Sequence, residues 1–255
     1  MTNFHINRNK ALHTLQKLLE TSFTTEVEYL SDSFLLQQQL ALDLFKKRIF
    51  LEKTIDETIA FNKRLTYPQD IKNIQLVTNA EDLIDVFKLR SHVYTEINYQ
   101  SQFPDTIEGL NFDTYDSHSA VLAYKTNNTM TATAKLIFAK DDELLPSEKN
   151  FNLSHIRKEY NKIGEIARLI VQNEKKGLSF EFKYLLAGIY HVFVNNDINM
   201  TISCIKKEHT RLYEKFGGGD IIENTDNFAT LGVPINILKW NPAESLPYFH
   251  KLILS

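Results

Sequence analysis

Residues 163–172, with the sequence IGEIARLIVQ, constrain the fold more than any other segment of this chain. The run is rich in β-branched and aliphatic residues, a pattern that is typical of a strand buried on both faces. It nevertheless contains Glu165 and Arg168, and residues three apart in a regular strand point to opposite faces of the sheet. The two side chains can therefore share one pocket if a β-bulge between residues 165 and 170 shifts the alternation.

Strand and helix patterns alternate after Pro68. Asn79 is expected to cap the first helix, and Asn127-Asn128 is a hairpin signal, whereas segment 141–162 is polar and gives no regular pattern. The order indicates an α/β fold with a mixed sheet. Strands are expected at 73–79, 119–125, 130–139, 163–172, 200–207 and 235–240, and helices at 80–97, 179–196 and 208–216.

Residues 1–66 contain neither Gly nor Pro and are expected to be helical throughout. Leu40, Leu44 and Leu51 follow helical spacing, and Tyr67-Pro68 ends the pattern because proline biases its predecessor away from helix. We therefore expect an N-terminal helical arm over 1–68 and a second domain over 69–255. An arm packed on that domain, a homodimerisation element and a lid over a lipid-binding groove are the three interpretations that stay open.

Composition excludes several classes of protein. The chain has 255 residues and a formal net charge of −3, which gives no reason to expect a nucleic-acid partner. A single cysteine allows no intrachain disulfide framework. The first residues lack an apolar signal-peptide core, and the sequence has no run of about 20 apolar residues that could span a bilayer. A cytoplasmic protein is expected.

Three motifs are better explained by structure than by chemistry. Gly217-Gly218-Gly219 follows a helix pattern, so it predicts a helix C-cap and a turn into a strand rather than a phosphate-binding loop. Cys204, five residues before His209, is interpreted as a buried structural cysteine, although a nucleophilic pair stays open. The histidine spacings match no metal motif, so no metal site is expected.

Charged residues before the second strand suggest a binding function. Asp113 and Asp116 flank Tyr115 in FDTYDSHSA, where they could close a local turn or hold an amine or an arginine. Arg90, in the amphipathic segment VFKLRSHVY, could reach either carboxylate. Alone, such an arginine is more often a surface residue with a buried stem.

Taken in order, LR-x-x-VY, FD-x-YD, a strand pair with a basic residue, and E-x-x-R-L-x-V resemble one branch of the GNAT-fold acyltransferases. That branch contains the acyl-homoserine-lactone autoinducer synthases and the long-chain N-acyl amino acid synthases. The resemblance covers about residues 73–215. Two positions depart from the autoinducer-synthase pattern. This chain has Asn111 where that pattern has an acidic residue, and Lys135 where it has arginine. Because lysine cannot reproduce a bidentate guanidinium contact, these departures favour the N-acyl amino acid enzymes.

The resemblance implies an acyltransferase in which an amine attacks a thioester carbonyl. It implies Glu165 as the general base, with Arg168 orienting that carboxylate or holding the acceptor's carboxylate. Arg90, Asp113, Asp116 and Lys135 are implied to frame the substrate pocket. No tightly bound cofactor and no metal are implied.

The expected donor is an acyl-phosphopantetheine on acyl carrier protein. Coenzyme A-dependent GNAT enzymes bind pyrophosphate with a glycine-rich motif, whereas this chain has EKKGLS at 174–179, where a single glycine fits. Lys175, Lys176 and Lys183 are expected to face the acidic carrier, aided by Arg157, Lys158 and Lys162. The alternatives are a coenzyme A-dependent N-acetyltransferase and a non-catalytic GNAT-like module that binds a lipid or a partner.

Overall fold

The computed structural model describes residues 32–68, 71, 73–172, 179–228 and 232–253. The chain divides into two compact units, Met1–Thr54 and Ile55–Ser255, and helix α2 (Asp32–Asn62) continues across the division. The helix predicted up to residue 66 therefore ends four residues earlier, and the part predicted over 1–31 lies outside the described residues. The domain boundary at Pro68 stays a prediction.

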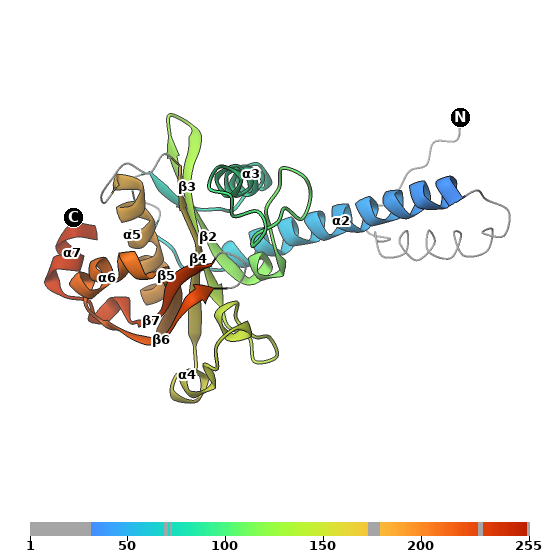
Figure 1. The fold of residues 1–255 in the computed structure, drawn as a ribbon. Helices are drawn as coiled ribbons and strands as arrows, with labels where there is room; N and C mark the ends of the chain where they lie inside the picture. Colours follow the sequence, from blue (N-terminus) through green and yellow to red (C-terminus); the bar gives the residue numbers. More distant parts are fainter. Residues whose placement is uncertain (1–31, 69–70, 72, 173–178, 229–231, 254–255) are drawn as a thin grey trace. The chain divides into compact units, whose positions relative to one another are not determined.

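A mixed sheet forms the centre of the second unit, as the sequence predicted (Figure 1). Its spatial order is β1-β2-β3-β4-β5-β7-β6. β4 and β5 run parallel, whereas the other neighbouring pairs of the described sheet are antiparallel. The strands are β1 (Ile74–Leu76), β2 (Ser119–Thr126), β3 (Thr129–Phe138), β4 (Ile163–Val171), β5 (Met200–Lys206), β6 (Gly219–Phe228) and β7 (Val233–Trp240).

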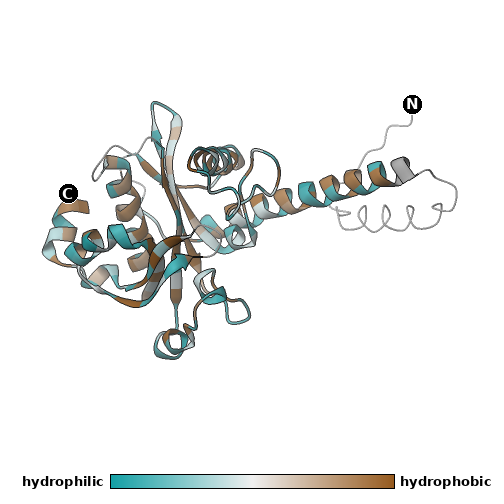
Figure 2. Ribbon diagram, viewed as in Figure 1, coloured by the Kyte–Doolittle hydropathy of each residue, from teal (hydrophilic) through white to brown (hydrophobic). Residues whose placement is uncertain are grey.

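Helices cover both faces of this sheet. Figure 1 shows α5, α6 and α7 on one face and α3 on the other. Figure 2 shows hydrophobic residues along α5 and the central strands, where Leu185 and Ile189 pack into one core cluster with Leu122 and Leu136. The helices are α3 (Ala80–Glu96), α4 (Ser154–Glu159), α5 (Phe180–Asn195), α6 (Thr210–Phe216) and α7 (Pro247–Ile253).

Local signals in the sequence account for several boundaries. The Asn79 side chain accepts a hydrogen bond from the N–H of Asp82 and caps α3, as predicted. Asn127 and Asn128 have φ of 50° and 63°, which is the geometry of a tight hairpin turn between β2 and β3. Gly217, with φ of 69°, caps α6 just before β6, so the glycine run has the predicted structural role.

β4 contains the bulge that its sequence required. Lys135 of β3 pairs with Ala167 and Thr133 pairs with Ile170, so two residues of β4 stand opposite the single residue between these partners. Arg168 lies in this bulge with φ of 52°. On the other side of β4, the pairing with β5 stops at Ile166 and Ser203, although both strands continue. β4 and β5 therefore separate just where the bulge occurs.

None of the helices in the described part of the chain combines the length and the apolar character that crossing a membrane requires.

Candidate active site

Asp113 is the centre of a charged cluster on the sheet face that carries α3. One carboxylate oxygen accepts a hydrogen bond from Lys135 Nζ at 2.7 Å. The other accepts from Arg168 Nη2 at 3.0 Å. The Asp113 side chain is 26% exposed and that of Arg168 is 14% exposed, so solutes can reach this side of the cluster. The bulge is what turns Arg168 toward the face of Lys135.

Asp116 forms the buried side of the cluster. Its carboxylate accepts from Arg90 Nη1 at 2.8 Å and lies 3.2 Å from Lys135 Nζ. The side chains of Arg90 and Asp116 are both fully buried. Asp116 also accepts from the N–H of Asp113, which closes a reciprocal capping box around the short helical turn η2 (Thr114–His118). The turn interpretation and the arginine-binding interpretation of this motif are thus both correct.

Lys135 bridges two separate carboxylates, those of Asp113 and Asp116, with one ammonium group. Burial lowers the pKa of Lys135, and the charges of Asp113 and Asp116 oppose that effect. Burial alone would raise the pKa of Asp113, but Lys135 and Arg168 together hold it well below its usual range. Asp113 is therefore an anion that orients cations, not a proton acceptor at neutral pH.

Two aromatic rings flank Arg168, and neither was assigned a role from the sequence. The Arg168 guanidinium carbon lies 4.3 Å from the ring centroid of Phe103 and 5.3 Å from that of Tyr94. Nη1 also donates to the Tyr94 hydroxyl at 3.2 Å. Burial would lower the pKa of Arg168, but Tyr94 and Asp113 outweigh it and raise that pKa further. Arg168 is thus held as a permanent cation between aromatic walls.

Glu165 lies on the same sheet face but has partners of its own. Its carboxylate accepts from the Ser147 hydroxyl at 2.8 Å and from the Ser147 N–H at 3.0 Å. Glu165 is 3% exposed, and burial raises its pKa to about 7, against the hydrogen bonds from Ser147. A carboxyl group with a pKa near 7 suits general acid–base chemistry at neutral pH.

The bulge therefore brings Glu165 and Arg168 to one face, as the sequence analysis required. Their hydrogen bonds lead to different partners, Ser147 for Glu165 and Asp113 with Tyr94 for Arg168. Arg168 is therefore held by Asp113 and Tyr94, and Glu165 is oriented by Ser147. Ser147 lies in the segment 141–162 that the sequence analysis treated as irregular, and it contacts a residue 18 positions away.

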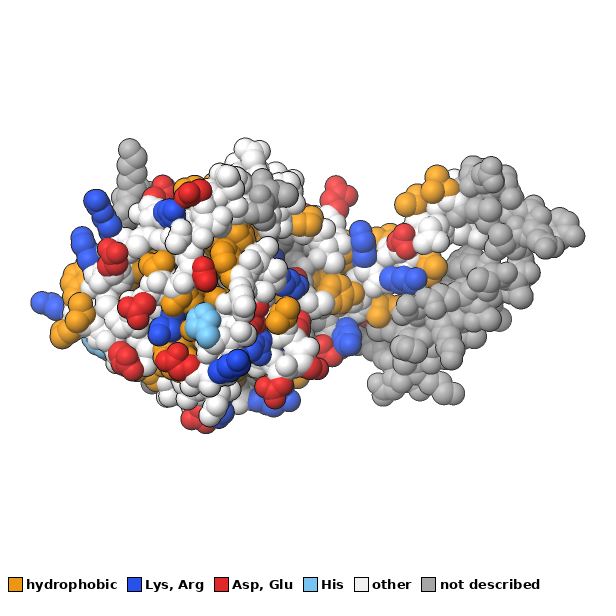
Figure 3. Space-filling view, turned by 60° about the horizontal axis from the view of Figure 1, so that its bottom comes forward, with side chains coloured by type: hydrophobic (Ala, Val, Ile, Leu, Met, Phe, Trp, Pro, Cys, Tyr) orange, Lys and Arg blue, Asp and Glu red, His pale blue; other side chains and the backbone are white. Residues whose placement is uncertain are grey.

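The predicted carrier-facing residues are only partly described. Lys175 and Lys176 lie outside the described residues. Lys183 is half-buried on α5, with its Nζ 5.5 Å from the ring centroid of Phe180. Arg157 is engaged within the chain by Glu148. Figure 3 shows one face of the molecule, on which basic and acidic side chains are interspersed rather than separated by sign. Carrier binding by these lysines stays a prediction.

Two other expectations concern sites without acyl chemistry. Burial raises the pKa of the Cys204 thiol to about 12, which disfavours a nucleophilic thiolate. Among the described residues, no group of His, Cys, Asp and Glu side chains is arranged to hold a metal ion.

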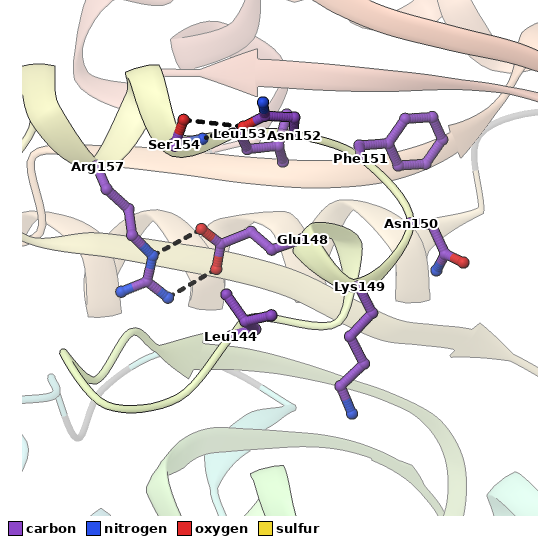
Figure 4. Close-up of a pocket in the computed structure, with 9 residues that line it drawn as sticks. All are labelled: Leu144, Glu148, Lys149, Asn150, Phe151, Asn152, Leu153, Ser154 and Arg157. Atoms are coloured by element: carbon purple, nitrogen blue, oxygen red, sulfur yellow. Dashed lines mark hydrogen bonds and ion pairs between the residues drawn. The ribbon is translucent and has the colours of Figure 1, made fainter.

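A surface pocket of about 430 Å³ lies beside the loop that carries Ser147 (Figure 4). Residues 148–154 line it together with Leu144 and Arg157, and none of the predicted catalytic or substrate-binding residues does. Figure 4 shows the Glu148–Arg157 pair at this pocket, with both carboxylate oxygens facing the guanidinium. The pocket therefore lies at the β3–β4 connection that carries Ser147, and its lining contains neither Glu165 nor the residues of the Asp113 cluster.

Comparison with solved structures identifies the fold as GNAT-like. The structure of FeeM, an N-acyl amino acid synthase from uncultured soil microbes, is 13% identical with a TM-score of 0.53, over 71% of this chain and 94% of FeeM. The CoA-dependent acyl-homoserine lactone synthase BjaI is 15% identical with a TM-score of 0.50, over 68% of this chain and 82% of BjaI. MesI, also a CoA-dependent acyl-homoserine lactone synthase, is 14% identical with a TM-score of 0.50, over 71% and 92%. A search of curated protein sequences finds no match.

The family model for the N-acyl amino acid synthase FeeM matches residues 85–241, which is more than half of the chain. The matched range contains the whole Asp113 cluster, Glu165 and the bulge of β4. This protein therefore belongs to the FeeM family of N-acyl amino acid synthases and is an acyltransferase.

Proposed function

We propose that the enzyme transfers a fatty acyl group from the phosphopantetheine thioester of acyl carrier protein to the amine of an amino acid or a related small molecule. The observation that carries this proposal is the position of Glu165, whose pKa is near 7, beside the point where β4 and β5 separate. In this proposal an extended pantetheine arm lies along the edges that β4 and β5 leave unpaired with each other beyond Ile166 and Ser203. Backbone N–H groups among residues 168–171, within and just after the bulge, are the proposed oxyanion donors.

The charges of the cluster support an amino acid as the acceptor. Arg90, Lys135 and Arg168 supply three basic groups against the two carboxylates of Asp113 and Asp116. The surplus is positive, which favours an acceptor that carries a carboxylate over a cationic one. Arg168, partly exposed and held between two rings, is the group that would bind it.

The chemical step then needs modest help. A free α-amino group has a pKa of about 7.7–8.0, so roughly 10% is neutral at pH 7. Glu165 takes the proton directly or through one water, which contributes about 10²–10⁴-fold. As the C–N bond forms, the C–S bond of the thioester breaks, and the pantetheine leaves as its thiol after the thiolate takes up that proton. Orientation of the amine against the thioester carbonyl supplies further acceleration.

The donor is tested with the purified enzyme, a mixture of amino acids, and either acyl carrier protein or coenzyme A loaded with the same acyl chain. We expect N-acyl amino acids by mass spectrometry and a higher kcat/KM with the carrier. An equal or higher kcat/KM with acyl-coenzyme A would make the carrier assignment wrong; BjaI and MesI are described as CoA-dependent. Absence of any N-acyl product would make the acceptor class wrong.

We further propose that the N-terminal region through residue 68 is a helical arm that is dispensable for the chemistry and can mediate a homodimer. Removing residues 1–66 is a poor test of this proposal, because it also removes Asn62. The side chain of Asn62 donates to the carbonyl of Val77 inside the second unit. A variant lacking residues 1–54 leaves that contact in place. We expect this variant to retain turnover. In light scattering after gel filtration, we expect it to have the mass of a monomer and the full chain to have the mass of a dimer.

A further inference from the structure

One residue binds both oxygens of the Glu165 carboxylate. The hydroxyl of Ser147 donates to Oε1 at 2.8 Å, and its backbone N–H donates to Oε2 at 3.0 Å. Both residues are 3% exposed. The contact joins β4 to the short helical turn η3 (Ser147–Lys149), which lies in the connection between β3 and β4. Glu165 is therefore oriented from outside the sheet, not by its neighbours in the strand.

The loop that carries Ser147 is itself braced. Glu148, the next residue, accepts from the N–H of Leu145 at 2.7 Å and from Arg157 Nε and Nη2 at 2.6 Å each (Figure 4). Arg157 also donates to two backbone carbonyls of the same loop. The Tyr115 hydroxyl, beside the Asp113 cluster, donates to the carbonyl of Leu144 at 2.8 Å. These bonds hold the donors of Ser147 in place before any substrate binds.

We infer that Ser147 is a positioning residue, whose hydroxyl and N–H together set the direction and the ionisation of the Glu165 carboxylate. The inference rests on the proposed function, in which Glu165 accepts the proton of the acceptor amine. Burial favours the neutral acid, and the two hydrogen bonds from Ser147 oppose it. The charges of Glu148 and Lys135 act in addition, Glu148 favouring the neutral acid and Lys135 the ionised form. Ser147 thus keeps a buried base available at neutral pH.

The unmodified enzyme gives the first test, whose deciding outcome does not depend on a variant that folds. The ¹H–¹⁵N resonance of the Ser147 amide is followed from pH 5 to pH 9. We expect it to titrate with a midpoint near the pKa of Glu165, about 7, and the titration to vanish in Glu165→Gln. A Ser147 amide that does not respond to pH in the unmodified enzyme would overturn the inference.

Kinetics give the second test. Ser147→Ala removes one hydrogen bond to a charged group. We expect this loss to shift the midpoint of the acidic limb of the kcat–pH profile upward by about one pH unit. At pH 7 the ionised fraction falls from about one half to about one tenth, so kcat falls about 5-fold and recovers near pH 9. The acceptor amine titrates equally in both enzymes, so the difference between the profiles belongs to Glu165. Ser147→Thr, which keeps the hydroxyl, should restore the profile.

Ser245→Ala is the matched control. Ser245 is also a buried serine, and its hydroxyl bonds to the carbonyl of Gly217 and the indole N–H of Trp240. We expect this variant to lose stability without a change in the midpoint of the kcat profile. A midpoint for Ser147→Ala equal to that of the unmodified enzyme, with Glu165→Gln inactive, would overturn the inference alone. Near-normal turnover of Glu165→Gln would instead overturn the proposed function.

Discussion

Asp116 is the carboxylate whose replacement the structure predicts to be most damaging to stability. Arg90, at 2.8 Å, and Lys135, at 3.2 Å, face it as buried cations. An asparagine in its place loses the charge and can offer its single oxygen either to the cations or to the N–H of Asp113, at present 2.9 Å away. Breaking a buried ion pair from one side costs about 3–5 kcal/mol. For a chain of this size that cost lowers Tm by about 6–20 °C.

The assay compares Asp116→Asn with Asp85→Asn in chemical and thermal denaturation. Asp85 lies in α3, the helix that carries Arg90, and pairs with Lys88 at 3.3 Å, but both side chains are more than half exposed. An exposed pair contributes about 0–1 kcal/mol, so Asp85→Asn should behave like the unmodified protein. A loss of less than about 1 kcal/mol for Asp116→Asn would show that the buried cluster does not depend on its carboxylate.

Three further predictions concern β4. Because burial raises the pKa of Glu165 from 4.5 to about 7, its stability contribution is full below pH 4.5 and is lost as pH rises through 7. The free energy of unfolding of the unmodified protein, relative to Glu165→Gln, should fall by about 3 kcal/mol over that window, and parallel curves would contradict it. Gly164→Ala should cost about 1–3 kcal/mol in denaturant unfolding, because a Cβ there lies 2.8 Å from Leu136 Cδ1; an unchanged midpoint would refute this. Arg168→Lys should lower kcat/KM about 10-fold or more, since lysine cannot bond Tyr94 and Asp113 while stacking on Phe103; wild-type kinetics would contradict the binding role.

Local features of this chain were predictable from sequence because their causes are local. Asn79 caps α3 through a bond three residues away, and Asn127-Asn128 turns the hairpin with its own positive φ angles. The bulge at Arg168 was predictable as a requirement, because two charged side chains three apart cannot share a face of a regular strand.

The parts that were not predicted have causes that lie elsewhere in the chain. β6 is an edge strand and is mostly exposed. Neither of its faces is buried, so its sequence lacks the alternation of apolar and polar residues that predicts a strand. Ser147 matters because the β3–β4 connection folds back onto Glu165, a contact that no periodicity shows. Phe103 likewise lies in a loop, and its place beside Arg168 depends on how that loop packs against α3.

The central claim is that Glu165 is the base of an amine acyl transfer. The most direct test is the rate of N-acyl amino acid formation by the purified protein and by Glu165→Gln, followed by mass spectrometry with saturating acyl donor and amino acid at pH 7. Glutamine keeps the size of the side chain and can still accept from Ser147, so the fold should persist. We predict a rate lower by about 10²-fold or more for Glu165→Gln. Equal rates for the two proteins would contradict the assignment.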